Sequence, residues 1–328
     1  MLRKLSQNCL CLCLDTNNIQ TGGEMREAKS KGRLLKDLIE APEILISPGI
    51  FDGYSARLVE SRGYKSGAIS GAGLSECHLG YPDRGLMGLD ENLSCCRKIA
   101  DCSNLLLHAD ADTGYGNAVN VFFVTQAFEK SGVAAVMFED QTWPKRCGHM
   151  VGKSVIAAEE MIEKIHAACD ARKDPDFVIK ARTDARGPLG LDEAIRRLNL
   201  YAEAGADLLF ADALLSEEDI RTVAANVDKP LTVNMGLGIR ARSTTPLIPP
   251  KKLEDLGVSA VSYPRLLTTS AVRGMINGFD AFEEMVKKNE PSDREDLCVN
   301  FEELNSMMEV EFLDELEERY AVGPEKAV

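Results

Sequence analysis

Aromatic residues are scarce in this chain of 328 residues: they make up 6% of it, and Trp143 is the single tryptophan. No apolar run approaches the roughly 20 residues that a helix needs to cross a bilayer. The ten cysteines include no Cys-x-x-Cys pair, which argues against a zinc ribbon. Basic residues are outnumbered, because 38 Lys and Arg face 52 Asp and Glu. The net charge of −14 argues against nucleic acid and anionic membranes as partners.

The scattered cysteines are typical of a reducing compartment, so we expect a cytoplasmic protein. Residues 1–25 differ from the rest of the chain, because a short apolar core follows Arg3 and Lys4 without a convincing cleavage site. We interpret this segment as a disordered or targeting-like tail, with organelle targeting as the weaker alternative. Met25 is an equally good natural start.

From residue 26 onward, short apolar runs alternate with longer helical patterns. The runs lie at residues 43–49, 66–70, 105–112, 134–140, 177–183, 207–212, 231–236 and 260–264. Eight strand–helix repeats predict an α/β fold, a (β/α)8 TIM barrel over residues 26–275, and the alternative is an open doubly wound sheet. The barrel is favoured because six of the runs end in a reactive or charged residue, whereas an open sheet gathers such groups at one switch point.

Residues 276–328 continue as helices whose Leu, Met, Val and Phe positions form an apolar stripe. This C-terminal helical extension is more helix than eight repeats require, so the stripe needs a partner surface. We expect a second subunit to supply that surface, and the flank of the barrel is the alternative.

Clustered acids follow two of the apolar runs. Asp110 and Asp112 end one of them and Glu139 ends another. The carboxyl ends of parallel strands are where barrels bind ligands, and residues two apart on a strand point the same way. Carboxylate oxygens suit Mg²⁺ or Mn²⁺, so these three acids are predicted metal ligands. Asp83, in the loop after the second run, is a fourth. Solvated loop acids, and a turn aspartate at Asp83, are the alternatives.

A basic motif with a cysteine follows Glu139 after a few residues: Lys145, Arg146, Cys147, Gly148 and His149. Neighbouring cations lower the pKa of a thiol, so Cys147 is a predicted nucleophile or proton donor. The loop is polar and contains glycine, so it can close over a site as a lid. A surface basic loop with an incidental cysteine is the alternative.

Two further segments are predicted to bind the ligand. Ser70-Gly71-Ala72-Gly73 offers small residues and backbone N–H groups to an anion, or else forms an ordinary tight turn. Arg182 ends the fifth run and is a predicted clamp for carboxylate or phosphate, or the partner of a neighbouring strand-end acid, and both can hold. Together these groups fit a small polycarboxylate whose carbanion or enolate is stabilised, with the metal polarising a 2-oxo or 2-hydroxy acid.

Several motifs of this chain are those of a known family. They are PGIFDGYSARLVESRGY, SGAG, GYPDRG, DADTGYG, FEDQ, KRCGH, KARTDA and NM…TPL. On these motifs the chain resembles the isocitrate lyase/phosphoenolpyruvate mutase superfamily over about residues 30–275. The KRCGH motif resembles the one found in the carbon–carbon lyases of that family, whereas the phosphonate-handling members of the family lack the cysteine. Among the lyases the chain looks most similar to 2-methylisocitrate lyase, 2,3-dimethylmalate lyase and oxaloacetate hydrolase.

The resemblance implies a barrel whose last helix is exchanged between paired subunits, a homotetramer built as a dimer of dimers, and Mg²⁺ or Mn²⁺ as the cofactor. The acids that match the metal site are Asp83, Asp110, Asp112 and Glu139. The predicted substrate-binding residues are Ser70, Gly71, Ala72, Asp83, Gly148, Arg182 and Asn234. The predicted catalytic residues are Cys147, Arg182 and His149.

The implied reaction is a retro-aldol cleavage of a 2-hydroxy di- or tricarboxylate. The 2-hydroxyl loses its proton, the C2–C3 bond breaks, the metal holds the emerging 2-oxo acid, and Cys147 protonates the enolate of the departing carboxylate. The alternatives are hydrolysis of oxaloacetate to oxalate and acetate, a mutase-like rearrangement of a phosphorus-containing group, and a degenerate member without activity. The intact KRCGH argues against the mutase, and the complete set of polar residues argues against the degenerate member.

The chain departs from the family pattern around the pocket. Methylisocitrate lyases carry Tyr where this chain has Ala68, and relatives have Glu where it has Asp212. The loop GLGIRARSTTP after Asn234 is longer and adds Arg240 and Arg242, which either bind another carboxylate or are solvated. If Arg240 binds the substrate, Arg240→Ala should raise KM, and an unchanged KM would contradict that role.

Overall fold

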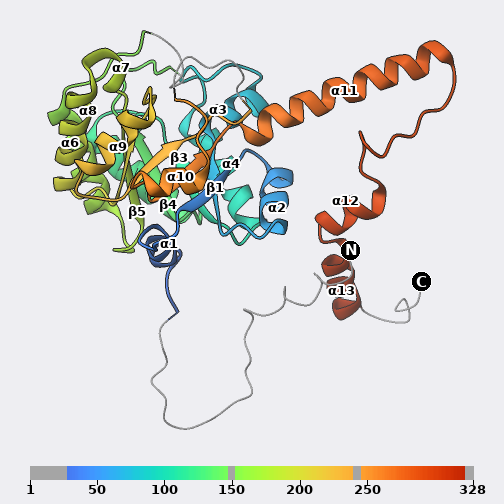
Figure 1. Cartoon of the computed structure of the whole chain (residues 1–328). Helices are drawn as coiled ribbons and strands as arrows, with labels where there is room; N and C mark the ends of the chain where they lie inside the picture. Colours follow the sequence, from blue (N-terminus) through green and yellow to red (C-terminus); the bar gives the residue numbers. More distant parts are fainter. Residues whose placement is uncertain (1–27, 147–151, 239–244, 322–328) are drawn as a thin grey trace.

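Eight parallel strands close into a barrel in this computed structural model, which describes residues 28–146, 152–238 and 245–321 (Figure 1). The strands follow one another around the barrel in chain order and are β1 (Leu45–Ile50), β2 (Ser66–Ile69), β3 (Leu106–Asp110), β4 (Ala135–Glu139), β5 (Val178–Thr183), β6 (Leu208–Ala211), β7 (Leu231–Asn234) and β8 (Ala260–Tyr263). The last strand closes the barrel against the first, with Leu45 opposite Ala260. The predicted (β/α)8 barrel is confirmed.

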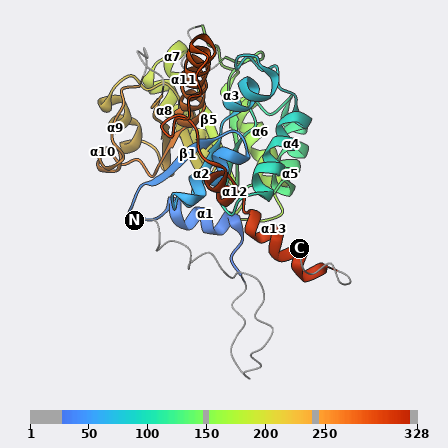
Figure 2. The same cartoon turned by 90° about the vertical axis from the view of Figure 1, so that its right-hand side faces the viewer.

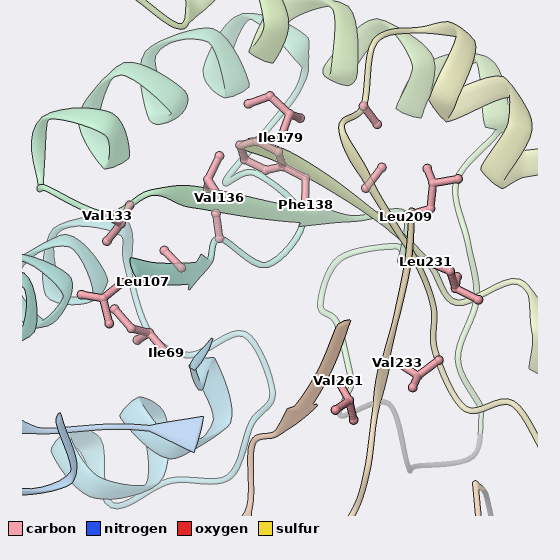
Figure 3. Packing of buried hydrophobic residues seen from close by; sticks show 14 of the residues in the cluster. Ile69, Leu107, Val133, Val136, Phe138, Ile179, Leu209, Leu231, Val233 and Val261 are labelled. Atoms are coloured by element: carbon pink, nitrogen blue, oxygen red, sulfur yellow. The ribbon is translucent and has the colours of Figure 1, made fainter. Parts of the chain in front are cut away.

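Alternation along the strands separates an outer apolar face from a polar interior. Val136 and Phe138 of β4, Ile179 of β5 and Leu209 of β6 belong to the main hydrophobic cluster, and Figure 3 shows them against the surrounding helices. Successive side chains of a strand point to opposite faces. The residues between these apolar positions therefore point into the barrel, and among them are the charged Glu139, Lys180 and Arg182.

Helices surround the strands in the order expected of strand–helix repeats (Figure 1). They are α2 (Gly53–Ser61), α3 (Gly71–Leu74), the π-helix η1 (Ser75–Leu79), α4 (Leu89–Asp101), α5 (Ala118–Lys130), α6 (Ala158–Ala171), α7 (Arg186–Leu189), α8 (Leu191–Glu203), α9 (Glu217–Ala225) and α10 (Pro250–Asp255). Helix α1 (Lys31–Ile39) begins at Ser30, whose side chain accepts a hydrogen bond from the Arg33 backbone N–H. Its Leu35 and Ile39 pack on residues at the amino ends of the strands. This packing closes the end of the barrel opposite the strand-end acids.

Helix α11 (Leu266–Lys288) projects away from the barrel, followed by α12 (Phe301–Met307) and α13 (Val310–Tyr320) (Figures 1 and 2). Only Thr268 of α11 is buried in the single chain. The large apolar side chains of α11 that are exposed are Val272, Met275, Ile276, Phe279, Phe282 and Val286. Their spacing forms one stripe along the helix. Exchange of this helix between subunits stays a prediction, as do the domain limits, and α11 runs unbroken through the expected limit between residues 275 and 276.

Among the described residues, no helix combines the length and the apolar character needed to cross a membrane.

Candidate active site

A cavity of about 80 Å³ opens at the carboxyl ends of the strands. The predicted site residues that line it are Ser70, Ala72, Asp83, Asp110, Arg182 and Asn234. Gly71, Asp112 and Glu139 lie beside it and contact residues of its wall. A side chain at Gly71 would place its Cβ 2.7 Å from Asp110 Oδ2, so any larger residue there would have to displace that carboxylate.

Lys145 lies among the four acids predicted as metal ligands. Its side chain is 3% exposed, and Nζ forms ion pairs with Asp83 and, at 2.7 Å, with Asp112 Oδ1. Burial alone would lower the pKa of Lys145, but Asp112, Glu139 and the other acids raise it well above its usual range. Within the part of the chain that the structure describes, no three acidic, His or Cys side chains are arranged to hold one metal ion. The acids instead surround the ammonium of Lys145. The sequence showed Lys145 only as a neighbour of Cys147 in the basic motif and did not indicate its contact with the acids.

Asp112 does not follow the expected strand alternation. Strand β3 ends at Asp110, and Asp112 has a φ of 51°, the left-handed region that non-glycine residues rarely adopt. The backbone N–H of Asp112 donates to Asp110 Oδ1 at 3.1 Å, which holds the turn. Burial raises the pKa of Asp112 to about 6, with Asp110 and Asp83 adding to the rise and Lys145 opposing it. The two acids are neighbours, but a tight turn and not strand periodicity brings them together.

Arg182 is shared among three carboxylates at the edge of the cavity. Its guanidinium donates to both oxygens of Asp184 at 2.8 and 3.0 Å, and pairs with Glu139 Oε2 at 3.3 Å and Asp212 Oδ2 at 3.1 Å. These acids raise the pKa of Arg182 well above its usual range against the effect of burial. Lys153 also pairs with Asp184 and Asp212, at 2.6 and 3.3 Å. Both expectations for Arg182 are thus compatible, because it pairs with strand-end acids and still lines the cavity.

Glu139 keeps one oxygen without a hydrogen bond. Its Oε1 is buried and has no hydrogen-bond partner among the described residues, whereas Oε2 faces Arg182. Burial raises the pKa of Glu139 well above the ordinary value. A buried oxygen in this state is costly unless a cation or proton donor meets it, which fits the metal-ligand role predicted from the sequence.

Behind this cluster, Asp140 supports the backbone that carries Arg182. Its Oδ2 accepts hydrogen bonds from Thr183 Oγ1 at 2.7 Å, Tyr201 Oη at 2.7 Å and Arg197 Nη1 at 3.0 Å. Its Oδ1 accepts one from the Asp184 backbone N–H at 2.9 Å. Asp140 is fully buried and borders no part of the cavity, so it acts through the position of Thr183 and Asp184.

The segment after β2 begins a helix and does not form a tight turn. Ser70 is the N-cap of α3, and its Oγ accepts a hydrogen bond from the Gly73 N–H at 3.1 Å. Ser70 nevertheless lines the cavity, and its contact with a ligand stays a prediction. Across the barrel, Asn234 Oδ1 accepts a hydrogen bond from Ser262, which fixes the orientation of its amide toward the cavity.

The floor of the cavity holds two residues that sequence reasoning did not include in the site, His108 and Lys180. Both point inward, two residues before Asp110 and Arg182 respectively, so strand alternation was the signal that could have found them. Lys180 Nζ lies 4.7 Å from the centroid of the Phe210 ring. His108 Nε2 lies 2.9 Å from Ser66 Oγ, and burial lowers the pKa of His108 to about 3.

Five predicted residues lie outside the described part of the chain. They are Cys147, Gly148 and His149 of the KRCGH motif, and Arg240 and Arg242 of the loop after β7. Their roles remain predictions. The basic motif is described as far as Arg146, whose backbone N–H and carbonyl both bond to the Gln141 side chain.

The family model described as phosphoenolpyruvate phosphomutase matches residues 35–283. The chain belongs to the phosphoenolpyruvate mutase/isocitrate lyase superfamily. A 2,3-dimethylmalate lyase from Eubacterium barkeri is 37% identical over 289 residues, which cover 88% of this chain and 98% of that one. A probable 2-methylisocitrate lyase from Corynebacterium glutamicum is 41% identical and covers 73% and 76% of the two chains. The resemblance read from the motifs is confirmed, and this superfamily member is an enzyme with lyases among its relatives.

Solved structures agree with the barrel. A structure of oxaloacetate acetylhydrolase with 3,3-difluorooxalacetate superimposes with a TM-score of 0.82 at 28% identity, covering 90% of this chain and 98% of that one. A phosphonopyruvate hydrolase in complex with oxalate and Mg²⁺ superimposes with a TM-score of 0.77 at 27% identity, covering 89% and 99%. The superfamily thus includes members that bind a small dicarboxylate and a divalent metal.

Proposed function

We propose that this superfamily member is a Mg²⁺- or Mn²⁺-dependent carbon–carbon lyase. It would cleave a small 2-hydroxy di- or tricarboxylate, of the 2-methylisocitrate or 2,3-dimethylmalate type, to a 2-oxo acid and a carboxylate. The observation that supports this most is the pairing, in one cavity wall, of a carboxylate cluster with the Arg182 guanidinium. A polycarboxylate can offer one carboxylate to Arg182 and other oxygens to a metal ion that the acids bind.

The chemistry of these acids suits a divalent cation, although in this arrangement they surround the Lys145 ammonium and no three of the described side chains are placed to hold one ion. Four carboxylates supply hard oxygen donors, Asp110 faces the cavity, and the buried Oε1 of Glu139 has no other partner in the described chain. Because Lys145 now neutralises Asp83 and Asp112, we expect its ammonium to move when a metal binds to these acids. When bound, the ion would polarise the oxygen at C2 of the substrate.

The chain's own groups would carry the remaining steps. Arg182 would bind a substrate carboxylate through the side of its guanidinium that Asp184 does not occupy, while the hydrogen bonds from Nε and Nη2 to Asp184 hold that guanidinium in place. A basic group of the site would take the proton of the 2-hydroxyl. The C2–C3 bond then breaks as the oxygen at C2 forms the carbonyl of the 2-oxo acid, and the bonding electron pair passes to the departing carboxylate as its enolate. Cys147 gives that enolate a proton, and His149 and Gly148 complete the binding loop, as the family motif implies.

Turnover of a panel of acids tests this proposal. The purified protein is incubated with Mg²⁺ and 2-methylisocitrate, isocitrate, 2,3-dimethylmalate, citramalate-type acids or oxaloacetate, and pyruvate, glyoxylate and oxalate are measured. Cys147→Ser and EDTA should each abolish the release of a 2-oxo acid. Cys298→Ser is the matched control, because Cys298 is exposed and lies after α11, far along the chain from the barrel. Release of a 2-oxo acid that survives EDTA would refute the metal-dependent lyase.

Hydrolysis of oxaloacetate is the second candidate, and the similarity to the oxaloacetate acetylhydrolase structure favours it. The same assay separates the two functions, because only the hydrolase releases oxalate. We also propose a homotetramer, in which the apolar stripe of α11 is covered by another subunit, and light scattering coupled to gel filtration would measure its mass.

A further inference from the structure

The cavity extends deeper than the strand-end charges. Ala68, His108 and Lys180 all line it, and each lies two residues before a strand-end residue that also lines it. A step of two residues along a strand is about 6.6 Å. Ala68 contributes only a methyl group at this depth, where Lys180 lines the same cavity.

Lys180 is the one cation of this wall that has no acidic partner in the described chain. The residue is 6% exposed, and its Nζ makes no hydrogen bond or ion pair there, although it lies over the Phe210 ring. The side chains of Lys145 and Lys153 are 3% and 5% exposed, yet each pairs with two carboxylates. The segments 147–151 and 239–244, which follow β4 and β7, contain no acidic residue that could supply a partner.

Lys180 is nonetheless charged at neutral pH. Burial lowers the pKa of its ammonium to about 8, while Asp110 and Asp212 act in the opposite direction through space. The pKa thus stays above neutral pH, so the ammonium is the main form at pH 7. A buried ammonium that lacks a charged acceptor is costly, unless a bound anion completes its hydrogen bonds.

His108 does not compete for this role. Ser66 Oγ donates to the Leu106 carbonyl at 2.8 Å, so its lone pairs receive the His108 Nε2–H. Because the pKa of His108 is lowered to about 3, its ring is neutral at physiological pH. The positive charge of the cavity floor is that of Lys180.

We propose that Lys180 and the cavity floor form a subsite for a further carboxylate of the substrate, carried on an arm that reaches below Arg182. The inference rests on the proposed function and narrows it, because a tricarboxylate can fill this subsite while its other groups stay at the strand ends. A carboxylate at this point would accept charge-assisted hydrogen bonds from the Lys180 ammonium in a site that is shielded from water.

Calorimetric titration of two inhibitors tests the subsite without any turnover. Oxalate is small enough to contact the strand-end groups alone, whereas propane-1,2,3-tricarboxylate also reaches the floor. With Mg²⁺ at pH 7, Lys180→Met should weaken binding of the tricarboxylate roughly 10- to 100-fold and that of oxalate by less than about threefold. Lys164→Met is the matched control, because Lys164 is as buried but donates to the Thr113 carbonyl outside this cavity.

Loss of affinity by the same factor for both inhibitors, or for neither, would overturn the subsite. Thermal melting of the free protein gives an independent check. Lys180→Met removes an unpaired buried charge, so the variant should melt no lower than the wild type, and clear destabilisation would show that the ammonium has a structural role instead.

A different result would refute the proposed function and leave the subsite untouched. Wild-type protein that releases no 2-oxo acid from any member of the panel refutes the lyase, whatever the inhibitors do. A Lys180→Met variant that cleaves the substrate as well as the wild type, and binds both inhibitors unchanged, refutes the subsite alone.

Discussion

Replacing Asp140 by asparagine should destabilise the protein by about 3 kcal/mol, because four donors converge on this one carboxylate. An asparagine has one oxygen and one NH2 group, so it must turn a donor toward either the Asp184 N–H or the three donors at the other oxygen. Breaking a buried ion pair costs about 3–5 kcal/mol. We expect the lower end, since Arg197 keeps Glu193 as a partner at 2.9 Å.

The same substitution should lower kcat/KM for 2-oxo acid release by about 10- to 100-fold. Asp140 holds Thr183 and the Asp184 backbone, and Asp184 in turn holds Arg182, so a small shift misplaces the substrate clamp. Tyr201→Phe is the matched control. It removes one of the four hydrogen bonds and leaves the carboxylate charged, so it should cost about 1.5 kcal/mol.

Urea unfolding followed by circular dichroism measures the loss of stability in both variants. Steady-state kinetics measures the loss of kcat/KM that a misplaced Arg182 should cause. A loss below about 1 kcal/mol for Asp140→Asn, or one equal to that of Tyr201→Phe, would refute the view that the carboxylate charge organises this network.

Four further outcomes are expected. The unfolding free energy of the wild type should rise by up to about 3 kcal/mol between pH 8 and pH 10.5, because the buried Lys180 amine has a lower pKa than the unfolded one and the cost of its charge disappears as it deprotonates. Urea titrations should show a smaller rise for Lys180→Met, and equal slopes would contradict the assignment. Arg182→Lys should lower kcat/KM by at least about 100-fold, since an ammonium cannot reproduce the bidentate fork, and near-normal kinetics would exclude the clamp. EDTA should abolish activity and Mg²⁺ or Mn²⁺ restore it, and activity that survives dialysis against EDTA would argue for a metal-free site. Phe279→Glu with Phe282→Glu should shift sedimentation toward a smaller species, whereas an unchanged mass would show that α11 is not an assembly surface.

The barrel could be predicted because its signal is local and repeated. Each buried run, such as the one that ends in Glu139, alternates with a helical pattern, and the closure of the sheet follows from the number of repeats. The polar strand ends were equally visible. Asp110, Arg182 and Asn234 come from different strands, and they line one cavity because the carboxyl ends of parallel strands share one edge.

Contacts that depend on loop geometry could not be predicted in this way. In the sequence Lys145 was only part of the basic motif, whereas in the structure its ammonium lies among the acids, next to a loop that the bonds of Gln141 to Arg146 hold. Asp112 adopts a left-handed conformation that no period-two pattern indicates. For Lys180, alternation with Arg182 shows which way the side chain points, yet the lack of an acidic partner is a property of the assembled barrel.

Helix α11 extends from the cavity wall to a surface that lies well away from it. It starts at Leu266, directly after Pro264 and Arg265 of the cavity wall, and its 23 residues make a rigid rod about 35 Å long. A rod of this length acts as a lever, because a small tilt at its base becomes a displacement of several ångströms at its far end. A surface that binds Phe279 and Phe282 therefore restricts the tilt of the whole helix, and with it the position of Pro264 and Arg265 in the cavity wall. The position of the cavity wall is then set in part about 20–24 Å away from it, by whatever surface holds Phe279 and Phe282.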